Sequence, residues 1–598
     1  MPFRLTQKRR QPEPPPAPPR PALSPLDVVL AYHQTTKHAP YRYARSLGYM
    51  DWDTQPNPFR RYSGARLVAL DEIAPGAEPS WDTIFQPGTI IPRLLDRRFL
   101  SQLFYDSLAL SAWKEYGDSR WALRVNPSSG NLHPTEGYLI SGPVAGLLGS
   151  AAVCHYAPNE HGLEVRRTLI AAQWQSLAEQ LPPGALLLAL TSIHWREAWK
   201  YGERAFRYCN HDIGHAIAAV AIAAAVMGWR ASLLETVPDA HLATLLGIAG
   251  QTDEEDEHLR IEAEHPDCLL VLYPATDPAH SNRLAGINDS QATEVATTNL
   301  VLPASLLAEL TGSPAAGTPN RLSSDHHPWP IIEVVAEATA RENSPEASYW
   351  HHAVDESMLA HPVTPSSPPA RQIIRQRRSA VDMDGVTGMS SEAFYTAMSR
   401  VLPGLTPFDA LPWKPAIHLA LFVHRVDNLA SGLYFLLRDP EEKGALQATM
   451  NPQFLWQQPA SCPETLPLYL LQTGDMRQTA QAVSCGQEIA SDGAFAVGML
   501  AEYEASLRRH GPWFYRRLHW EAGAIGQMLY LEAEAAGLRA TGIGCFFDDS
   551  MHQVLGLPGY RTAGQPSLRY QTVYHFTVGG PVEDTRLRTL PAYAHLGR

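Results

Sequence analysis

Three short segments of the chain combine residue types that could hold a ligand. The first spans residues 126–134 and reads NPSSGNLHP, which gathers two hydroxyls, a glycine and an amide. Such a loop lets backbone N–H groups and small polar side chains approach a flat heterocycle or a phosphate closely. The same residues would also serve as a helix N-cap, where a Ser or Asn side chain accepts hydrogen bonds from free backbone amides. Taken alone, the segment leaves both interpretations open.

The second segment, residues 375–379, reads RQRRS and offers three guanidinium groups and one hydroxyl. This set suits a phosphate dianion, to which each shielded charge-assisted hydrogen bond contributes roughly 1.5–3 kcal/mol. Basic runs are more often solvated surface, so the pattern alone favours that alternative.

The third segment, residues 541–549, reads TGIGCFFDD and follows an apolar, Ala-rich stretch. Its two glycines, Gly542 and Gly544, would allow backbone amides to face a flat ligand. The segment is not a dinucleotide-binding fingerprint, because it lacks the third glycine and follows a predicted helix instead of a strand.

Two histidines raise the question of a metal. His211 and His215 have the spacing that H-E-x-x-H zinc enzymes use, but Asp212 stands next to the first histidine in place of the Glu base. The internal repeat described next has Trp520 and Ala524 at the two histidine positions. We therefore expect no metal site.

An internal repeat positions these segments. Residues 206–231 and 515–540 superpose without gaps at an offset of 309, which pairs Gly214 with Gly523. Both copies have the composition of a helix of about 20 residues, and the period is far too long for a solenoid. We infer two related α+β domains fused head to tail, which form a pseudo-dimer within one chain.

The domain boundaries follow from composition. Residues 1–26, basic and then Pro-rich, are expected to be a disordered tail; residues 27–340 form an N-terminal domain with insertions, residues 341–370 a linker or surface arm, and residues 371–598 a C-terminal domain. Apolar runs predict strands, and longer runs predict helices at residues 99–114 and 490–508. The predicted strands are at 185–192, 268–273, 418–426, 431–437, 466–472 and 574–578.

Composition excludes several classes of function. The formal net charge of −13 argues against a general affinity for nucleic acid or anionic lipid. The longest uncharged apolar run, residues 216–227, would span about 18 Å of the roughly 30 Å of bilayer hydrocarbon, so no membrane span is expected. Six cysteines without a C-x-x-C pair indicate neither a zinc ribbon nor a disulfide framework, and we expect a reduced, cytoplasmic setting.

Together, the motifs resemble the nitroreductase family, and more closely the SagB/ThcOx-type flavin-dependent dehydrogenases in a tandem form. The resemblance lies in the order of the 126–134 loop, the YGERAFRY segment at 201–208, an acidic residue with Gly at the head of an Ala-rich helix, and the glycine loop after it. It covers about residues 101–273 and 371–590. It implies an α/β sandwich whose long central helices pack at a dimer interface, with FMN bound in the crevice between the two halves.

The resemblance also implies roles for individual residues. One half would hold the FMN phosphate and ribityl chain, and the other half would contact the ring system. The phosphate and ribityl side comprises Arg377, Arg378, Ser379 and Arg588; the ring side comprises Pro127, Ser128, Ser129 and Asn131; Gly542 and Gly544 would bring amides near the reactive edge, and Gln527 would line the intact pocket.

The two halves are not equivalent in these motifs. The first half has the 126–134 loop, where the second has only Pro-Trp-Lys-Pro at 412–415. The second half has the RQRRS segment, where the first has only Asp-Arg-Arg-Phe at 96–99. We therefore expect one complete composite FMN site and one degenerate site.

Lys200 and Tyr201 resemble the Lys-Tyr pair that azoline dehydrogenases of this family use to aromatise a thiazoline or oxazoline. A desolvated Lys would suit proton removal coupled to hydride loss. Alternatively, the two residues simply begin a helix. The implied partners are a small-molecule or modified-peptide substrate and other enzymes of a biosynthetic complex. An NAD(P)H-dependent nitro or quinone reductase and a non-catalytic scaffold of a peptide-modifying complex remain as alternative functions.

Overall fold

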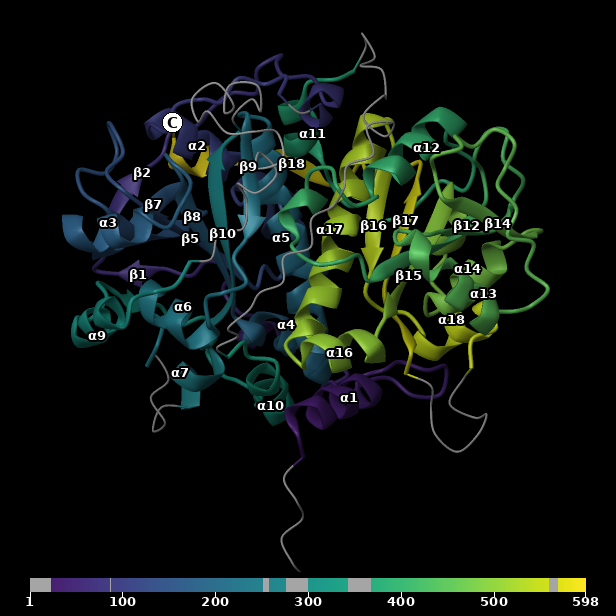
Figure 1. Cartoon of the computed structure of the whole chain (residues 1–598), viewed down its shortest axis with the longest axis horizontal. Coiled ribbons are helices and arrows are strands. Elements are labelled where there is room, and N and C mark those ends of the chain that lie inside the picture. Colours follow the sequence, from purple (N-terminus) through teal and green to yellow (C-terminus); the bar gives the residue numbers. More distant parts are fainter. Residues whose placement is uncertain are drawn as a thin grey trace, which may run out of the picture.

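The computed structural model describes residues 23–86, 88–250, 257–275, 300–342, 367–558 and 568–597. Figure 1 shows the first half in blue and teal beside the second half in green and yellow, with two long helices between them. Most of the expected N-terminal tail and of the expected linker lies outside the described residues. Helix α1 (Pro25–Thr35) begins at the second-last residue of the predicted tail, and helix α11 (Ala370–Gln376) begins at the last residue of the predicted linker.

The two repeat copies form the central helices α5 (Ala205–Ala225) and α17 (Phe514–Ala535), which confirms the predicted helix pair. Equivalent positions of the two helices contact each other. The Phe206 and Tyr515 rings, for example, stack with centroids 6.4 Å apart. Such contacts between equivalent residues mean that the helices run side by side in the same direction.

The helices pack most closely where the repeat pairs two glycines. A Cβ atom on Gly214 would collide with the backbone carbonyl of Trp520, and one on Gly523 would collide with that of His211. Any side chain here would push the helix backbones apart, which explains why both copies of the repeat have Gly at this position.

Each half contains an antiparallel sheet with the same strand order. Among the described residues, the first sheet has the order β2-β7-β6-β5-β8-β10-β9 and the second β14-β13-β12-β15-β17-β16, so the second matches the first without its edge strand β2. The strands of the first sheet are β2 (Arg66–Ala69), β5 (Thr135–Ser141), β6 (Ala152–Ala157), β7 (Gly162–Thr168), β8 (Leu186–Ser192), β9 (Trp229–Leu233) and β10 (His265–Pro274). Those of the second are β12 (Ile417–Val423), β13 (Gly432–Leu436), β14 (Leu468–Thr473), β15 (Phe495–Glu502), β16 (Arg539–Ile543) and β17 (Tyr570–Gly579).

The repeat extends beyond the central helices. At the same offset of 309, α6 (Asp239–Leu246) superposes on α18 (Asp548–Leu555) end to end. The predicted fold, two fused α+β domains of one topology that form a pseudo-dimer within the chain, is therefore confirmed. None of the helices in the described ranges is long and apolar enough to cross a membrane.

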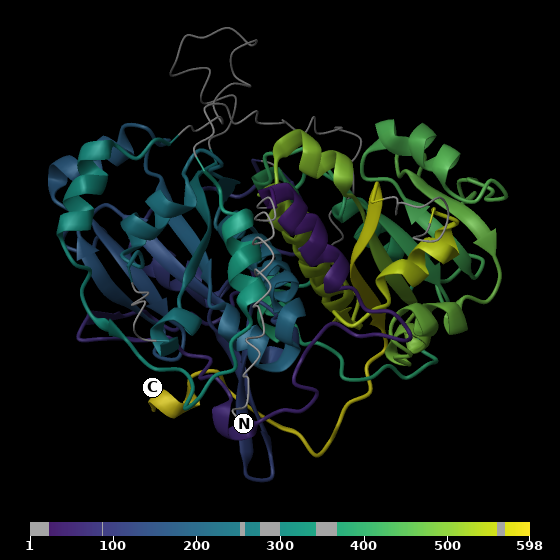
Figure 2. The same cartoon turned by 90° about the horizontal axis from the view of Figure 1, so that it is seen from below.

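Both ends of the described chain lie against the opposite half. The His33 side chain of α1 is 3.2 Å from the Gln571 side chain of β17. At the other end, β18 (Arg588–Leu590) pairs with β3 (Leu110–Tyr116), which forms a hairpin with β4 (Ser119–Arg124). Figure 2 shows this last, yellow segment crossing beneath the molecule to the side of the first half. These crossings attach the halves to each other at their edges as well as along the central helices.

Two predicted helices were wrong in part. Residues 99–114 contain all of α2 (Arg97–Tyr105) except its first two residues, followed by most of β3. Residues 490–508 contain β15 between the short helices α15 (Ile489–Asp492) and α16 (Glu504–His510). The β15 sequence FAVGMLAE consists largely of good helix formers, but it lies between β12 and β17 with nearly every residue buried. Burial on both faces of a sheet overrides weak helix propensity.

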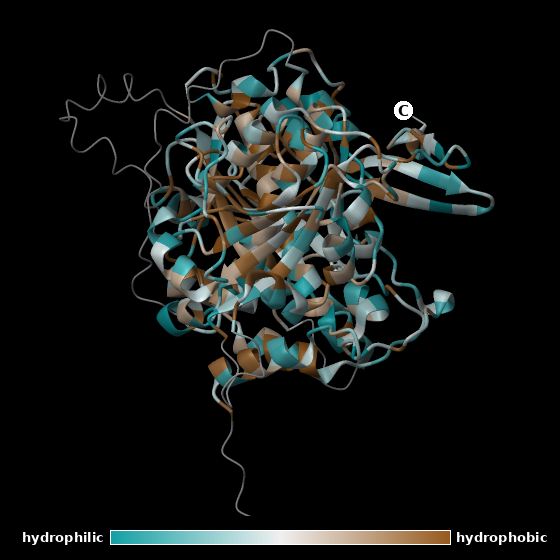
Figure 3. Ribbon diagram, turned by 90° about the vertical axis from the view of Figure 1, so that its right-hand side faces the viewer, coloured by the Kyte–Doolittle hydropathy of each residue, from teal (hydrophilic) through white to brown (hydrophobic). Residues whose placement is uncertain are grey.

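The cores lie on the faces of these sheets and along the central helices. One large apolar cluster includes residues of both halves, and one smaller cluster lies on the outer face of each sheet. Figure 3 shows the hydrophobic strands gathered inside and hydrophilic residues spread over the surrounding helices. The shared cluster makes the interface between the halves part of the folded core.

Candidate functional site

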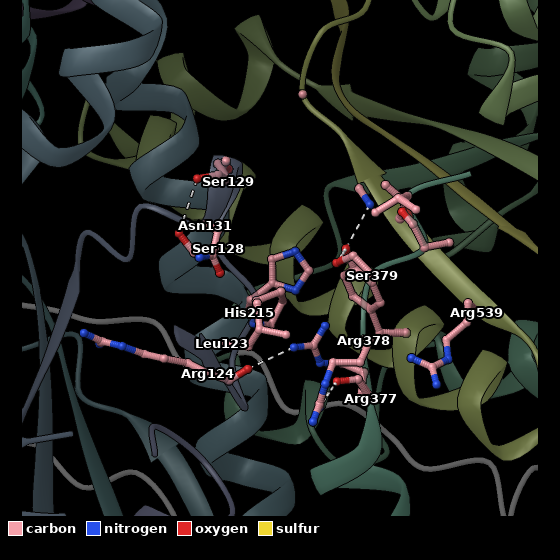
Figure 4. A pocket seen from close by; sticks show the side chains of 18 of the residues that line it. Leu123, Arg124, Ser128, Ser129, Asn131, His215, Arg377, Arg378, Ser379 and Arg539 are labelled. Atoms are coloured by element: carbon pink, nitrogen blue, oxygen red, sulfur yellow. Dashed lines mark hydrogen bonds between the residues drawn. The ribbon is translucent and has the colours of Figure 1, made fainter. Parts of the chain in front are cut away.

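A cavity of about 670 Å³ lies where the two halves meet. The 126–134 loop and the β3–β4 hairpin of the first half face the RQRRS segment and β16 of the second half, as Figure 4 shows. Ten of the sequence-predicted site residues line it: Pro127, Ser128, Ser129, Asn131, Tyr201, Arg377, Arg378, Ser379, Gly542 and Gly544. The fold thus brings together residues that are more than 400 positions apart.

Hydrogen bonds within the first half shape the loop. Ser128 Oγ accepts a hydrogen bond from the His133 amide at 2.8 Å, and Asn131 Nδ2 donates to the Ala122 carbonyl at 2.9 Å. Gly130 has φ +59°, and a Cβ atom there would lie 2.6 Å from the Tyr201 hydroxyl. The loop is a single 3-10 turn and not the N-cap of a longer helix, so two of its polar side chains serve to hold its shape.

The opposite wall is strongly basic. The Arg377 guanidinium donates to the carbonyls of Val125 and Arg124 at 3.1 and 3.0 Å and lies 5.0 Å from the Tyr530 ring centroid. Burial and the nearby charges of Arg377 and Arg539 lower the pKa of Arg378 to about 9. Glu534 lies 3.3 Å from Arg539, so three guanidiniums share this one buried carboxylate, and such a surplus of positive charge favours a bound anion.

Backbone and hydroxyl groups fill the space between the basic wall and β16. The hydroxyls of Ser379 and Tyr530 are 2.8 Å apart, and the Gly542 amide donates to the Tyr530 hydroxyl at 3.1 Å. A Cβ atom on Gly542 would collide with the Tyr574 hydroxyl, and one on Gly544 would lie 2.7 Å from the Tyr208 ring. Glycine at these two positions therefore leaves room for aromatic side chains around the cavity.

A buried carboxyl pair that the sequence did not predict lies behind the loop. Asp212 accepts hydrogen bonds from the Ser129 amide and hydroxyl at 3.0 Å, and burial raises its pKa to about 7. Glu197 lies close enough for the Asp212 charge to add to the effect of burial, which raises the pKa of Glu197 well above its usual range. The offset of 309 pairs Asp212 with Glu521, so the repeat has an acidic residue at this position in both copies. The contact of Asp212 with the loop appears only in the folded structure.

The two histidines of the H-x-x-x-H pattern are engaged with an aromatic ring. His211 stacks on Tyr574 with centroids 4.1 Å apart, and His215 Nε2 lies 3.2 Å from the Tyr574 hydroxyl. Burial lowers the pKa of His215 to about 3, so it is neutral. Within the described residues no cluster of three His, Cys, Asp or Glu side chains has the arrangement of a metal site.

Three predicted residues lie outside the cavity lining. Gln527 is behind His215, with its carbonyl oxygen 3.3 Å from Nδ1. Lys200 is half-buried on the far side of Gly130. Arg588 is on β18 at the surface, where its side chain is 75% exposed and 3.4 Å from Glu115.

The equivalent position on the other side of the pseudo-dimer is filled by an ion pair. The repeat places Glu235 where the cavity has Gly544, and Arg517 where it has Tyr208. Arg517 donates to the Glu235 carboxylate at 3.1 Å, and Arg341 also bonds to Glu235. All three side chains are at least 92% buried, so they occupy the volume that stays open in the cavity.

The two segments expected to be degenerate are used structurally. Asp96 caps α2, and Arg97 bonds to Asp71, so this segment forms a helix start. In the other half, Trp413 and the Ala416 amide donate to Glu521, much as Ser129 donates to Asp212. The 412–415 segment therefore takes the place of the loop, and its Trp413 binds the buried Glu521 carboxylate.

Comparisons with known proteins match this arrangement of two fused α+β domains. Residues 117–257 and 442–579, together somewhat under half of the chain, match the model of the Nitroreductase family. The structure also resembles a crystal structure of an Anabaena variabilis protein provisionally assigned as a nitroreductase, with a TM-score of 0.61 and 20% identity over 93% of this chain and 99% of that one. This likeness shows that the whole tandem fold is shared.

Two further similarities are more limited. A Methanocaldococcus jannaschii protein, also provisionally assigned as a nitroreductase, is 33% identical over 60 residues, which are 10% of this chain and 30% of that protein. A chain of the Escherichia coli microcin synthetase McbBCD complex, with truncated pro-MccB17 bound, aligns over 42% of this chain and 94% of its own length at 16% identity and a TM-score of 0.23. The match to the Methanocaldococcus jannaschii protein therefore spans less than a third of the length of that curated relative.

Proposed function

We propose that this protein is an FMN-dependent oxidoreductase of the SagB/ThcOx type with one composite flavin site. The observation that carries the proposal is the open cavity in which the 126–134 loop of one half faces Arg377, Arg378 and Ser379 of the other. Its volume of about 670 Å³ is within the usual range of ligand sites, roughly 300–1,000 Å³.

The chemistry of the lining fits FMN. The surplus of guanidinium groups matches a phosphate, because a guanidinium has five N–H donors and the backbone carbonyls take up only part of those of Arg377 and Arg378. Opposite them, Pro127, Gly130 and Tyr201 offer a narrow wall of small and flat groups for a ring system. When bound, FMN would supply hydride transfer, and the amides of Gly542 and Gly544 would stabilise negative charge on its reduced ring.

We assign Arg377, Arg378 and Ser379 to the phosphate and ribityl chain, and Pro127, Ser128, Ser129 and Asn131 to the ring side. Gln527 acts through His215, which it orients, and Arg588 acts at most as a charge at the outer rim. Asp212 adds a proton-exchanging carboxyl at the cavity wall, because its pKa of about 7 lets it hold or release a proton near neutral pH.

The substrate class we propose is an azoline heterocycle in a peptide, with Lys200 and Tyr201 as the substrate-side pair. The Lys200 amine lies behind the loop next to Tyr201, with 5.2 Å between its nitrogen and the ring centroid. The variant Lys200→Ala should lose azoline turnover and still bind FMN. Unchanged turnover would remove Lys200 from this role, and Lys443→Ala, on the outer helix α13 (Lys443–Thr449), is the matched control.

The purified protein also distinguishes two alternative functions, a flavin reductase and a non-catalytic scaffold. Rapid bleaching of the bound flavin by NADH or NADPH, with turnover of nitroaromatics or quinones, would favour a flavin reductase. A purified protein that neither contains nor takes up flavin would favour a scaffold in a peptide-modifying complex. The proposal predicts flavin absorption in the purified protein and slow reduction by nicotinamides compared with the azoline substrate.

A further inference from the structure

Two cysteines far apart in the sequence meet at the edge of the cavity. The sulfurs of Cys485 and Cys545 are 2.7 Å apart, and both residues are partly exposed. The four other cysteines, Cys154, Cys209, Cys268 and Cys462, are buried. Because 60 positions separate them in the sequence, they form no C-x-x-C motif.

The surrounding backbone holds the two cysteines together. The Phe547 amide donates to the Val483 carbonyl at 2.8 Å, and Gln487 Nε2 donates to the Cys545 carbonyl at 2.9 Å. Cys485 has φ +56°, a left-handed conformation that costs free energy in a residue with a side chain. The fold thus places the Cys485 sulfur against its partner in spite of local strain.

The pair connects two compartments. Cys545 lines the cavity between the halves, next to Gly544. Cys485 lines a separate shallow hollow on the outer surface, together with Gly486 and Phe547. The pair therefore has one residue in the lining of the proposed flavin site and one in the lining of a hollow that is open to solvent.

The electrostatics of the two thiols differ. The hydrogen bond between the two sulfurs and the charge of Arg204 lower the pKa of Cys545, although its burial opposes this. The same hydrogen bond and burial raise the pKa of Cys485. Two neighbouring thiols whose pKa values are shifted apart are suited to disulfide exchange, because the thiol with the lower pKa forms the attacking thiolate more readily.

The repeat shows that the pair is a property of the intact site. At the offset of 309, Cys545 corresponds to Thr236, which lies next to Glu235 in the filled position. Only the open cavity therefore has the cysteine.

Building on the proposed flavin site, we propose that Cys485 and Cys545 form a reversible disulfide that exchanges two electrons with the bound flavin. In oxidation by an external disulfide, the two thiols lose two electrons and two protons, the S–S bond forms, and the external disulfide becomes two thiols. In the reverse direction the S–S bond accepts two electrons and two protons from the reduced flavin, which returns to its oxidised form. The pair would thus link the cavity to thiol–disulfide partners in solvent.

The first measurement is a thiol count in denaturant after treatment with glutathione disulfide. The wild type should fall from the six thiols of the sequence to four with no glutathione adduct in its mass spectrum. Cys485→Ser and Cys545→Ser should each show no internal crosslink, and any thiol they lose from their five should appear as a glutathione adduct. The matched control Cys462→Ser, which removes a buried cysteine elsewhere, should fall from five to three. Peptide mapping should find a Cys485–Cys545 crosslink, and a wild-type count that stays at six would overturn the proposal.

The second measurement tests electron exchange. Illumination of the anaerobic, disulfide-containing holoprotein with EDTA reduces bound flavin, and two thiols per chain should then reappear. The flavin-free protein treated in the same way should keep its disulfide. A holoprotein that bleaches with the disulfide intact would overturn the exchange. A chain that forms the disulfide but never binds flavin would instead overturn the proposed function, so the two failures are distinguishable.

Discussion

At the scale of single residues, the most informative group is Asp212, a buried carboxyl that joins the loop to a central helix. Its hydrogen bonds to Ser129 fix the loop from behind, while burial keeps its pKa near neutrality. A group of this kind links the shape of the site to pH.

We expect Asp212 to make stability fall as pH rises from about 4 to about 7. In this range the folded protein keeps the Asp212 proton that the unfolded chain releases near 3.8, so stability is greatest at low pH and is lost as pH rises through the folded pKa of about 7. The contribution is on the order of 4 kcal/mol, at 1.36 kcal/mol per pKa unit.

The thermal midpoint measured against pH for Asp212→Asn and wild type checks this. The variant should lose this part of the pH slope. Ser129→Ala keeps the carboxyl but removes a hydrogen bond that lowers its pKa, so its slope should extend to higher pH. Parallel curves for wild type and Asp212→Asn would refute the assignment.

Residue types and spacing selected the loop and the basic segment, and the fold brings both to the lining of the same cavity. They could not place Arg588, Lys200 or Gln527, whose positions depend on how a β-strand and two helices turn relative to the cavity. Asp212, Tyr530 and Tyr574 escaped prediction for the same reason: each is an ordinary buried residue until the other half of the chain lies against it.

At the scale of elements, the contact between α5 and α17 depends on two glycines. Replacement of Gly214 or Gly523 by Ala would place a methyl group against the backbone of the opposite helix, which cannot move away as a side chain can. Overpacking of this kind typically costs about 1–3 kcal/mol.

We therefore expect Gly214→Ala and Gly523→Ala each to lower the thermal midpoint clearly. Gly444→Ala in α13 is the matched control, because a Cβ atom there meets open space, and Ala is favoured over Gly in a helix by roughly 0.5–1 kcal/mol. If all three variants have the same thermal midpoint, the close contact at Gly214 and Gly523 does not limit the packing of the two helices.

The elements themselves were predictable where the pattern was long and the environment uniform. The two repeated helices could be predicted because about 20 residues of Ala-rich sequence favour an α-helix, and the structure confirms both. The strand β15 was missed since its residue types favour helix, and only pairing with β12 and β17 on both edges makes it a strand.

At the scale of the whole molecule, two equivalent ion pairs join the halves. Arg207 of the first half bonds to Asp548 of the second at 2.6 Å, and Arg516 of the second bonds to Asp239 of the first at 2.5 Å. The offset of 309 relates Arg207 to Arg516 and Asp239 to Asp548, so the pseudo-dimer preserves one interaction twice. Only the first pair has a further buried guanidinium, Arg204, on the same carboxylate.

Asp548→Asn should destabilise the protein by about 3–5 kcal/mol, because it leaves two buried guanidiniums without a charged partner. Asp239→Asn should cost less, since Arg516 also lies 3.7 Å from Asp267. Asp475→Asn, which breaks an exposed pair with Arg477, is the control and should leave the thermal midpoint unchanged. Equal effects of the first two variants would contradict this ranking.

The central claim is that the tandem chain forms one flavin site and not two. The direct measurement is the number of FMN molecules per chain, from flavin released on denaturation of protein saturated with FMN. We predict one for the wild type, almost none for the double variant Arg377→Ala/Arg378→Ala, and one for Arg97→Ala/Arg98→Ala in the corresponding segment of the first half. A wild-type ratio near two, or a ratio of zero, would contradict the claim.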